Sequence, residues 1–433
     1  HAAGKGGETG MIVLMFVLMF LLFVLTVPVA TSLGLASAIT VLGLEMPAGL
    51  VVQRFFSGLN SFTLLAIPFF ILAGALMESA GISQRIVDFV ATMVGHYHGG
   101  LATILIISCM FFGALSGSAA ATAAAIGSIM IPNMVKRGYD VRFSAATQAS
   151  AAGLAVIIPP SISMILYCVA TNVSITSMFV AGVIPGILLG LTEILYAWYV
   201  SRKKGYAGDR KYTWKERGTS FRKAIWALFM PVIILGGIYS GLFTATEASA
   251  VAVAYAIFVG FVIYKELTWK KLMNTFAEAV ILVAVIMLVL STADLFAYVL
   301  TFAQIPTIVA NFFISIAGNK YIFLLLINLF LFLVGMFFDP GPGMIILAPI
   351  LSPAAVALGI DPIHFGLIMV INFSIGAITP PFAVNLFVSS QVAGIKYEQI
   401  VRPILPYIAL LAIDQLIISY VPPLSLLLPG LLG

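Results

Sequence analysis

Long apolar runs separated by short polar segments dominate the sequence from Met11 onward. Residues 143–191 and 340–360 contain no charged side chain, and His364 is the one exception in residues 362–395. At about 1.5 Å per residue, about 20 residues cross the hydrocarbon core of a bilayer, so the first run is long enough to cross it twice. The pattern predicts a chain of membrane-spanning helices.

Gly, Pro and charged residues mark where these helices end. The predicted spans are 11–44 (one helix and a short second one after Pro28), 61–77, 84–95, 100–112, 142–157, 161–172, 178–201, 222–242, 247–264, 274–301, 320–338, 362–378, 382–392 and 399–421. Residues 86–90 and 306–317 are too short or too mixed to assign. The run from Met11 shows no cleavage site, so we interpret it as a retained span and not as a signal peptide.

Two of the spans are interrupted by adjacent prolines, Pro159-Pro160 and Pro380-Pro381. Proline lacks an amide hydrogen, clashes with the carbonyl four residues earlier and disfavours the helical conformation in the residue before it. Both spans must therefore unwind. An unpaired carbonyl in hydrocarbon costs several kcal/mol, so this backbone persists only where protein, water or an ion satisfies it. Because sodium is a hard cation that prefers oxygen ligands, the breaks predict a cation site that needs no acidic side chain.

The two interrupted spans belong to an internal repeat. An offset of 221 residues carries Gly138, Asp140, Pro132, Pro185 and the first diproline onto Gly359, Asp361, Pro353, Pro406 and the second. Met110-Phe111-Phe112 recurs as Met336-Phe337-Phe338 at an offset of 226, which predicts a second copy five residues shorter upstream. Chance similarity between apolar segments is the alternative, but the ordered landmarks favour a true duplication. Duplicated broken helices are typical of secondary transporters with inverted repeats.

A segment of small residues precedes each broken span. Residues 113–128 read GALSGSAAATAAAIGS, and residues 340–349, PGPGMIILAP, are broken by Pro and Gly. We interpret both as tips of re-entrant hairpins. The alternative is close helix packing, for which Gly113-xxx-Gly117 and Gly186-xxx-Gly190 both have the spacing. We assign packing to the second pair and a hairpin tip to the first.

Composition agrees with a polytopic membrane protein: 62% of the residues are hydrophobic and 9% are charged. The net charge of +5 does not indicate nucleic-acid binding, because nine of the 21 Lys and Arg lie in residues 202–223. By the positive-inside rule this is a cytoplasmic loop, and Lys265, Lys270 and Lys271 also point inward. Trp214 and Trp269, beside these basic segments, are predicted interfacial anchors.

Few other residues carry chemistry. Cys109 and Cys168 lie in apolar context and are interpreted as packing residues, while His96, His98 and His364 lack metal-ligand spacing. Glu247 is predicted to begin a helix, where an acid complements the helix dipole. No GxxxxGK[ST] phosphate-binding loop occurs, and neither a Ser and His pair in facing spans nor paired intramembrane acids are visible. The chain is therefore not expected to be an enzyme.

The same segments resemble the large membrane subunit of the tripartite ATP-independent periplasmic (TRAP) transporters, the DctM-like family. The similar stretches are residues 66–89, 113–132, 157–167, 241–256, 337–351, 359–387 and 420–429. They follow the family order over nearly all of the chain after Met11. No single stretch identifies the family, but together they are highly specific for it.

The resemblance implies an all-α polytopic fold with inverted repeats, two re-entrant hairpins and two broken helices, arranged as a scaffold and a mobile elevator-type transport domain. The implied division is residues 1–10 (a linker or a remnant added outside the native sequence), 11–60 (scaffold helices), 61–200 (first repeat, hairpin 1 at 110–133, broken helix at 142–172), 201–223 (basic cytoplasmic loop), 224–301 (scaffold helices), 302–425 (second repeat, hairpin 2 at 336–353, broken helix at 362–392) and 426–433 (C-terminal tail).

The family also implies the function and the partners. Members of this family take up an organic acid across the bacterial inner membrane, driven by two or more sodium ions and without ATP. A small four-helix membrane subunit and a periplasmic substrate-binding protein complete the system. The substrate is expected to be a C4-dicarboxylate or sialic acid, with a slight preference for sialic acid. A channel built on the same broken helices is the alternative.

The resemblance places two sodium sites at hairpin tips and the adjoining breaks. Matching positions for the first are Gly113, Ser116, Ala155, Ile158 and Pro160, and for the second Gly335, Gly376, Thr379 and Phe382. The offset of 221 carries Ala155 and Ile158 onto Gly376 and Thr379. Where the family usually has Gly-Pro, this chain has Ala155-Val156, and Ala resists positive φ, which puts the geometry of the first site in doubt.

The substrate carboxylates are expected to meet positive helix ends and side-chain donors near the midplane. The candidates are Ser116, Ser118, Ser161 and Asn385. Asp339 either interacts with a cation or holds its hairpin. Arg142, near a helix end, is more typical of a headgroup contact than of an anion site.

Overall fold

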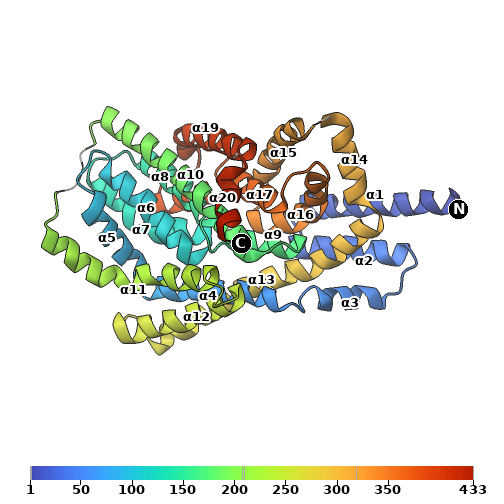
Figure 1. Cartoon of the computed structure of the whole chain (residues 1–433), viewed down its shortest axis with the longest axis horizontal. Helices are drawn as coiled ribbons and strands as arrows, with labels where there is room; N and C mark the ends of the chain where they lie inside the picture. Colours follow the sequence, from blue (N-terminus) through green and yellow to red (C-terminus); the bar gives the residue numbers. More distant parts are fainter. Residues whose placement is uncertain (1, 207, 209, 318, 433) are drawn as a thin grey trace.

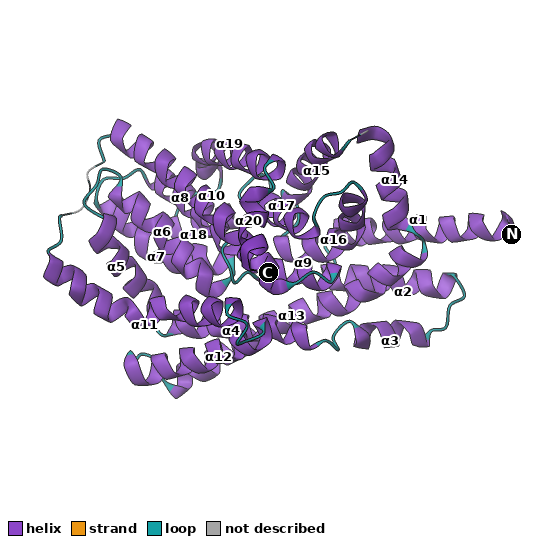
Figure 2. Cartoon of the chain, viewed as in Figure 1, coloured by secondary structure: helices purple, strands orange, loops and turns teal. Residues whose placement is uncertain are grey.

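The computed structural model describes residues 2–206, 208, 210–317 and 319–432, and this part of the chain is all-helical (Figures 1 and 2). The first half contains α1 (Ala2–Val24), α2 (Val29–Gly43), α3 (Gly49–Ser57), the 3₁₀ turn η1 (Phe62–Leu65), α4 (Ala66–Ser79), α5 (Ile82–Val94), α6 (Gly100–Ser116), α7 (Ala119–Lys136), α8 (Val141–Gly153), the 3₁₀ turn η2 (Leu154–Val156), α9 (Ile162–Thr171) and α10 (Ile175–Lys203). The second half contains α11 (Trp214–Tyr239), α12 (Ala245–Phe258), the π-helical turn η3 (Val259–Ile263), α13 (Trp269–Phe302), α14 (Ile305–Ala317), α15 (Lys320–Gly335), α16 (Pro340–Ala357), α17 (Pro362–Gly376), α18 (Val384–Ala393), α19 (Glu398–Tyr420) and α20 (Pro423–Leu432).

Within the described residues, seven helices are long and apolar enough to cross a membrane. Helices α6, α15, α17 and α18 are apolar but shorter, between 10 and 17 residues each. These short helices are the arms of hairpins and the halves of broken helices. The chain is a multi-pass membrane protein.

Both predicted hairpins are present. Helices α6 and α7 pack against each other and reverse direction at Gly117, whose φ of +59° suits glycine. Helices α15 and α16 form the second hairpin, which turns at residues 336–339. The first predicted tip, residues 113–128, contains its turn. The second, residues 340–349, was wrong, because these residues begin α16 and the chain reverses just before them. Each hairpin is also longer than predicted, because its arms continue as regular helix over residues 100–136 and 320–357.

The offset of 221 holds through the hairpins. Ser118 and Asp339, 221 residues apart, are the N-caps of α7 and α16, and Asp140 and Asp361 cap α8 and α17. The predicted offset of 226 was wrong. Residues 110–112 lie inside α6 whereas residues 336–338 lie in the turn after α15, so these triplets are not equivalent and the second copy is not shortened.

The structure also differs from the predicted bounds elsewhere. Helix α1 begins at Ala2, so residues 2–10, interpreted as a linker or an added remnant, are helical. The basic loop is shorter than predicted, because α10 continues to Lys203 and α11 begins at Trp214. The predicted tail belongs to α20, which packs on α10 and α17. Residues 306–317, left unassigned, belong to α14.

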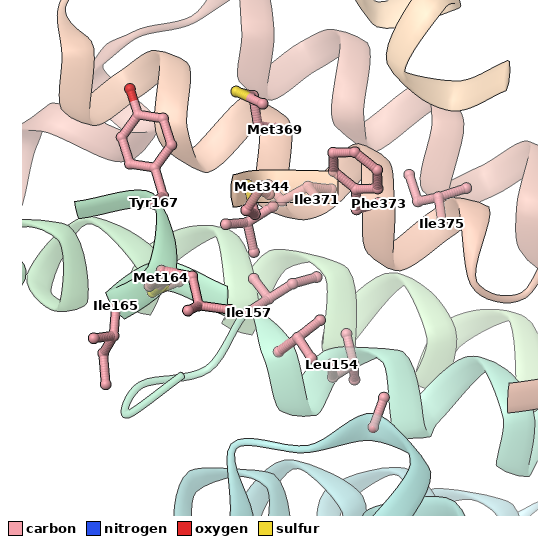
Figure 3. Packing of buried hydrophobic residues seen from close by; sticks show 14 of the residues in the cluster. Leu154, Ile157, Met164, Ile165, Tyr167, Met344, Met369, Ile371, Phe373 and Ile375 are labelled. Carbon is pink, nitrogen blue, oxygen red and sulfur yellow. The ribbon is translucent and has the colours of Figure 1, made fainter. Parts of the chain in front are cut away.

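The two broken helices cross near the centre of the repeat. The Ser374 hydroxyl of α17 donates to the Gly153 carbonyl of α8 at 2.8 Å, and these two residues are themselves 221 apart. A contact between equivalent positions places them beside the axis that relates the repeats. Buried side chains of η2, α9, α16 and α17 pack around this crossing, including Ile157, Met164 and Phe373 (Figure 3).

The helices before and between the repeats, together with α4 from the start of the first repeat, form one side of the molecule. Helix α4 packs on α12 and α13, and α13 packs on α2. In Figure 1 these helices lie along the lower side, and α10, α17 and α19 lie along the upper side. Both hairpins meet the lower layer, because α6 contacts α4 and α16 contacts α13.

Candidate functional site

The first hairpin tip touches the first helix break. A Cβ placed on Gly113 would lie 2.6 Å from Ala155 Cα, and one placed on Gly117 would lie 3.0 Å from the Pro160 carbonyl oxygen. Ala155 lies in the η2 turn and is not among the residues with positive φ, so the absence of glycine there costs no strain. The structure therefore brings together Gly113, Ala155 and Pro160, three of the five residues assigned to the first sodium site.

The other two residues of that site lie at its edges. Ser116 packs against α4, where a Cβ on Gly74 would lie 2.9 Å from Ser116 Cα, and its hydroxyl lies 3.1 Å from that of Thr122. Ile158 packs against α10, 2.8 Å from where a Cβ on Gly186 would lie. This close contact at Gly186 confirms that the Gly186-xxx-Gly190 pair serves helix packing.

The prolines leave carbonyls without their helical partners, as predicted, and neighbouring groups take up part of the deficit. The Ala155 carbonyl would pair with the amide of Pro159, which has no hydrogen, whereas the Ile158 amide still makes its ordinary helical bond to the Leu154 carbonyl at 2.9 Å. The Val156 carbonyl accepts from the Ser161 hydroxyl at 2.5 Å. The Ala155 oxygen is thus one of the acceptors that the backbone of the first break leaves available.

The second break has the same construction. A Cβ on Gly335, at the end of α15, would lie 3.2 Å from Gly376 Cα. The main-chain amide of Thr379 donates to the Gly376 carbonyl at 2.8 Å, and the main-chain amide of Asn385 donates to the Ala377 carbonyl at 3.1 Å. Each of these carbonyl oxygens keeps a second lone pair. The expectation of bare carbonyls is therefore too simple here, because the break supplies its own amide donors.

Thr379 and Phe382 complete the residues assigned to the second site. Thr379 is buried, and its hydroxyl donates to the Ile375 carbonyl at 2.7 Å, which leaves the hydroxyl lone pairs available. The Phe382 ring is exposed and packs against the Phe337 ring at 5.7 Å between centroids, so only its backbone is suited to an ion. Both diproline bonds, Pro159-Pro160 and Pro380-Pro381, are cis.

The Ser374 to Gly153 hydrogen bond gives a test of the crossing itself. Replacing Ser374 with alanine leaves the buried Gly153 carbonyl without its side-chain donor, so we expect unfolding in detergent to become easier by about 1–3 kcal/mol. Ser390→Ala is the matched control, because its hydroxyl bonds only to the Phe387 carbonyl of its own helix α18. Equal stability losses in the two variants would contradict a structural role for the crossing.

A cavity of about 460 Å³ lies where the tips and breaks converge. Its lining comes from α4, α13, the first turns of α7, α9 and α16, and the residues around both breaks. Three of the four predicted substrate residues, Ser116, Ser118 and Asn385, line it. Ser161 does not, because its hydroxyl bonds to Val156 and caps α9.

Asn385 is the lining residue with an available donor. It is 2% exposed, and its side-chain nitrogen has no hydrogen-bond partner within the described chain. An unpaired buried amide costs about 1–3 kcal/mol, so a ligand oxygen that accepts from it would recover this energy. The Ser118 hydroxyl is partly used, because it caps α7 through the Ala121 amide.

The charges of the cavity could not be foreseen from the sequence. Its described lining includes Glu78, Glu278 and Asp339 and no Lys, Arg or His. Asp339 caps α16 by accepting from the Gly341 amide at 3.4 Å, in agreement with a role in holding the hairpin. Positive potential comes from the N-termini of α7, α9 and α16, where the first amides lack helical partners.

Other candidates lie away from the cavity. Arg142 is exposed and lies 3.7 Å from the Asp140 carboxylate. His364 is buried and bonds to Ser425 and to the Ser419 carbonyl, so it joins α17 to α19 and α20. Glu247 forms a capping box with Thr244 at the start of α12, which confirms its predicted position. Trp214 and Trp269 are exposed at helix starts, where interfacial anchors belong.

One feature of the repeat has no counterpart in the sequence predictions. Glu193 of α10 and Asp414 of α19 are 221 residues apart and both buried. The Ser150 hydroxyl of α8 donates to Glu193 at 2.5 Å. The hydrogen bond between Ser150 and Glu193 is visible only in the structure, because nothing in the sequence of these spans links the two residues.

Comparison with known proteins agrees with the architecture. A family model described as the DctM component of the tripartite ATP-independent periplasmic transporter matches residues 16–424. The chain is 44% identical over 404 residues to the C4-dicarboxylate TRAP transporter large permease protein DctM of Pseudomonas aeruginosa, covering 93% of this chain and 94% of the relative.

Two further relatives carry different substrate names. The isethionate TRAP transporter permease protein DctMQ of Oleidesulfovibrio alaskensis is 41% identical, with 95% of this chain and 65% of that protein covered. The sialic acid TRAP transporter large permease protein SiaM of Vibrio cholerae is 37% identical, with 93% and 95% covered. Among solved structures, the YdaH transporter of Alcanivorax borkumensis aligns with a TM-score of 0.62 at 16% identity, covering 85% of this chain and 86% of that one, which supports the fold alone.

Proposed function

Because the chain belongs to the DctM family of TRAP transporter components, a family of transporters and not of enzymes, we propose that it carries a small organic acid into the cell together with sodium ions. The observation that carries this proposal is the convergence of two equivalent tip and break contacts on one cavity. A channel needs a continuous path, whereas here a ligand-sized cavity lies between two hairpin tips. The channel alternative is therefore not favoured.

Sodium fits the chemistry of the two contacts. The assigned residues offer main-chain carbonyls and the hydroxyls of Ser116 and Thr379, all hard oxygen donors, and no thiol or imidazole. The ions would also supply positive charge beside a cavity whose described lining has no cationic side chain. We propose one ion at Gly113, Ser116, Ala155, Ile158 and Pro160, and another at Gly335, Gly376, Thr379 and Phe382.

The substrate is proposed to be a small organic anion. Its carboxylate would accept from the Asn385 side chain and from the first amides of α7 and α16, with Ser116 and Ser118 nearby. The C4-dicarboxylate relative of Pseudomonas aeruginosa, at 44% identity, and the isethionate relative, at 41%, are more similar to this chain than the sialic acid relative, at 37%. We therefore favour a small dicarboxylate or related acid, and this reverses the slight preference for sialic acid that the sequence suggested.

An elevator movement is proposed for the transport step. The cavity lies between the hairpin tips and the layer of α4 and α13, so a shift of both repeats along that layer would move the cavity across the membrane. On α13, the residues that line the cavity extend from Val289 back to Glu278, that is, toward the N-terminal end of the helix, where Lys270 lies. By the positive-inside rule this end is cytoplasmic, so the proposed state is open to the cytoplasm.

The proposed setting is the bacterial inner membrane, with a small membrane subunit and a periplasmic substrate-binding protein as partners. The tripartite description of the family and the DctMQ name of one relative support this assembly. Exposed apolar side chains on α11 and α13, such as Phe229 and Ile281, leave surface for lipid or for a membrane subunit.

Uptake into proteoliposomes tests the proposal. We expect the chain, reconstituted with its small subunit, to accumulate radiolabelled C4-dicarboxylate only when sodium is outside and the cognate binding protein is present. Potassium in place of sodium should abolish accumulation, because the larger ion fits the same oxygens poorly. Equal uptake in potassium would refute sodium coupling, and sodium-independent current without the binding protein would instead indicate a channel.

A further inference from the structure

A second recess, of about 620 Å³, lies between α5, the start of α11 and the end of α12, away from the candidate site. Its lining is Gly81, Gln84, Arg85 and Asp88 of the α5 region, Arg222, Lys223 and Trp226 of α11, and Ile263, Tyr264 and Glu266 after α12. Three cationic side chains therefore face two carboxylates.

One of the three cations is already compensated. The Arg85 guanidinium donates to Glu266 at 2.6 Å and to the Gly81 carbonyl at 2.7 Å, and it stacks over the Tyr264 ring at 3.9 Å. The Tyr264 hydroxyl in turn donates to the Lys223 carbonyl at 3.0 Å. These contacts fix one wall of the recess and tie α12 to α11.

The other two cations are uncompensated. Arg222 and Lys223 are adjacent, exposed and without an ion pair in the described part of the chain. The remaining carboxylate, Asp88, accepts from Gln84 at 2.7 Å on its own helix. A recess with two adjacent unpaired cations is suited to an anion, and phosphate accepts charge-assisted hydrogen bonds from Arg and Lys.

The recess continues into an apolar surface. Trp226 is 38% exposed, Phe229 one turn further along α11 is 49% exposed, and Val262 beside the lining residue Ile263 is 53% exposed. Trp269, three residues after the lining residue Glu266, marks this level as an interface. A ligand with an anionic head and apolar chains therefore matches the surface better than a soluble phosphate does.

We propose that this recess binds the phosphate of an anionic phospholipid from the cytoplasmic leaflet, with the acyl chains along Trp226 and Phe229. Basic pockets between helices on the cytoplasmic side have this role in membrane proteins. The lipid would bridge α5 and α11. Helix α5 connects α4 to the hairpin helix α6. A lipid bound in the recess would therefore hold this connection against α11.

Binding of fluorescent phosphatidylglycerol to the purified full chain in micelles tests the proposal. The double variant Arg222→Gln/Lys223→Gln should bind it about 30-fold more weakly, on the basis of about 1 kcal/mol per basic residue. Lys203→Gln/Lys215→Gln removes the same charge outside the recess and should leave affinity unchanged. Arg222→Lys should retain most of the binding, which separates loss of charge from misfolding.

Three results would overturn the proposal. The first is wild-type affinity in the Arg222→Gln/Lys223→Gln variant. The second is phosphatidylcholine binding as tightly as phosphatidylglycerol. The third is displacement of the lipid by millimolar inorganic phosphate or glycerol 3-phosphate, which would make the recess a site for soluble phosphate.

Discussion

Replacing Gly376 with alanine is expected to abolish sodium-driven uptake and to destabilise the protein by about 1–3 kcal/mol or more. The new Cβ would fall on the main-chain carbon, Cα and oxygen of Gly335. A main chain cannot rotate aside as a flexible side chain can, so the hairpin and the break must separate. This displacement would pull apart the oxygens assigned to the second ion, and uptake should fall at least about tenfold.

The matched control is Gly236→Ala. A Cβ at Gly236 of α11 meets nothing within 4 Å, so this variant should keep full uptake and gain slightly in helix stability. Uptake in proteoliposomes and thermal unfolding in detergent would be measured on both variants. Near wild-type uptake in Gly376→Ala would show that the contact between hairpin tip and break is not needed for transport.

Replacing Thr379 with valine is expected to raise the sodium concentration for half-maximal uptake by about tenfold or more, because a cation site loses affinity with each oxygen ligand removed. Valine has nearly the shape of threonine but lacks the hydroxyl. The change also removes the hydrogen bond to the Ile375 carbonyl, so loss of the bond must be separated from loss of the ligand.

Thr301→Val makes that separation. The Thr301 hydroxyl donates to the Ala297 carbonyl four residues earlier at 2.8 Å, the same bond that Thr379 makes, but on α13 and exposed. Its sodium dependence should equal that of the wild type. If Thr379→Val showed the wild-type sodium dependence with normal maximal uptake, the hydroxyl would not be an ion ligand.

Much of the local architecture followed from residues that act on their own backbone. The diprolines break their helices in any environment, because the missing amide hydrogens cannot be supplied elsewhere. Asp140 and Asp361 cap helices because a carboxylate at that position accepts the first amides, and Glu247 does so with Thr244. Gly117 suited a hairpin turn because positive φ is easy for glycine.

The candidate site was only partly predictable for a physical reason. Ser161 and Ser118 look alike in sequence, yet only Ser118 lines the cavity, because the Ser161 hydroxyl is taken by the Val156 carbonyl. Glu78 and Glu278 come from α4 and α13, which the repeat pattern does not link, so no spacing could place them in one lining. The false equivalence of residues 110–112 and 336–338 arose because apolar triplets recur by chance.

By itself, the sequence determined the all-helical membrane fold, the repeat, the two breaks and the first turning point, since these depend on hydropathy and on proline, glycine and cap chemistry within a few residues. Only the tertiary structure decided which oxygens and amides face one another. The approach of Gly335 to Gly376 and the bond from Ser374 to Gly153 join helices distant in the chain, and the same packing buries the Asn385 side-chain amide without a partner in the described residues. Such contacts depend on how whole helices pack, and a local pattern does not encode that packing.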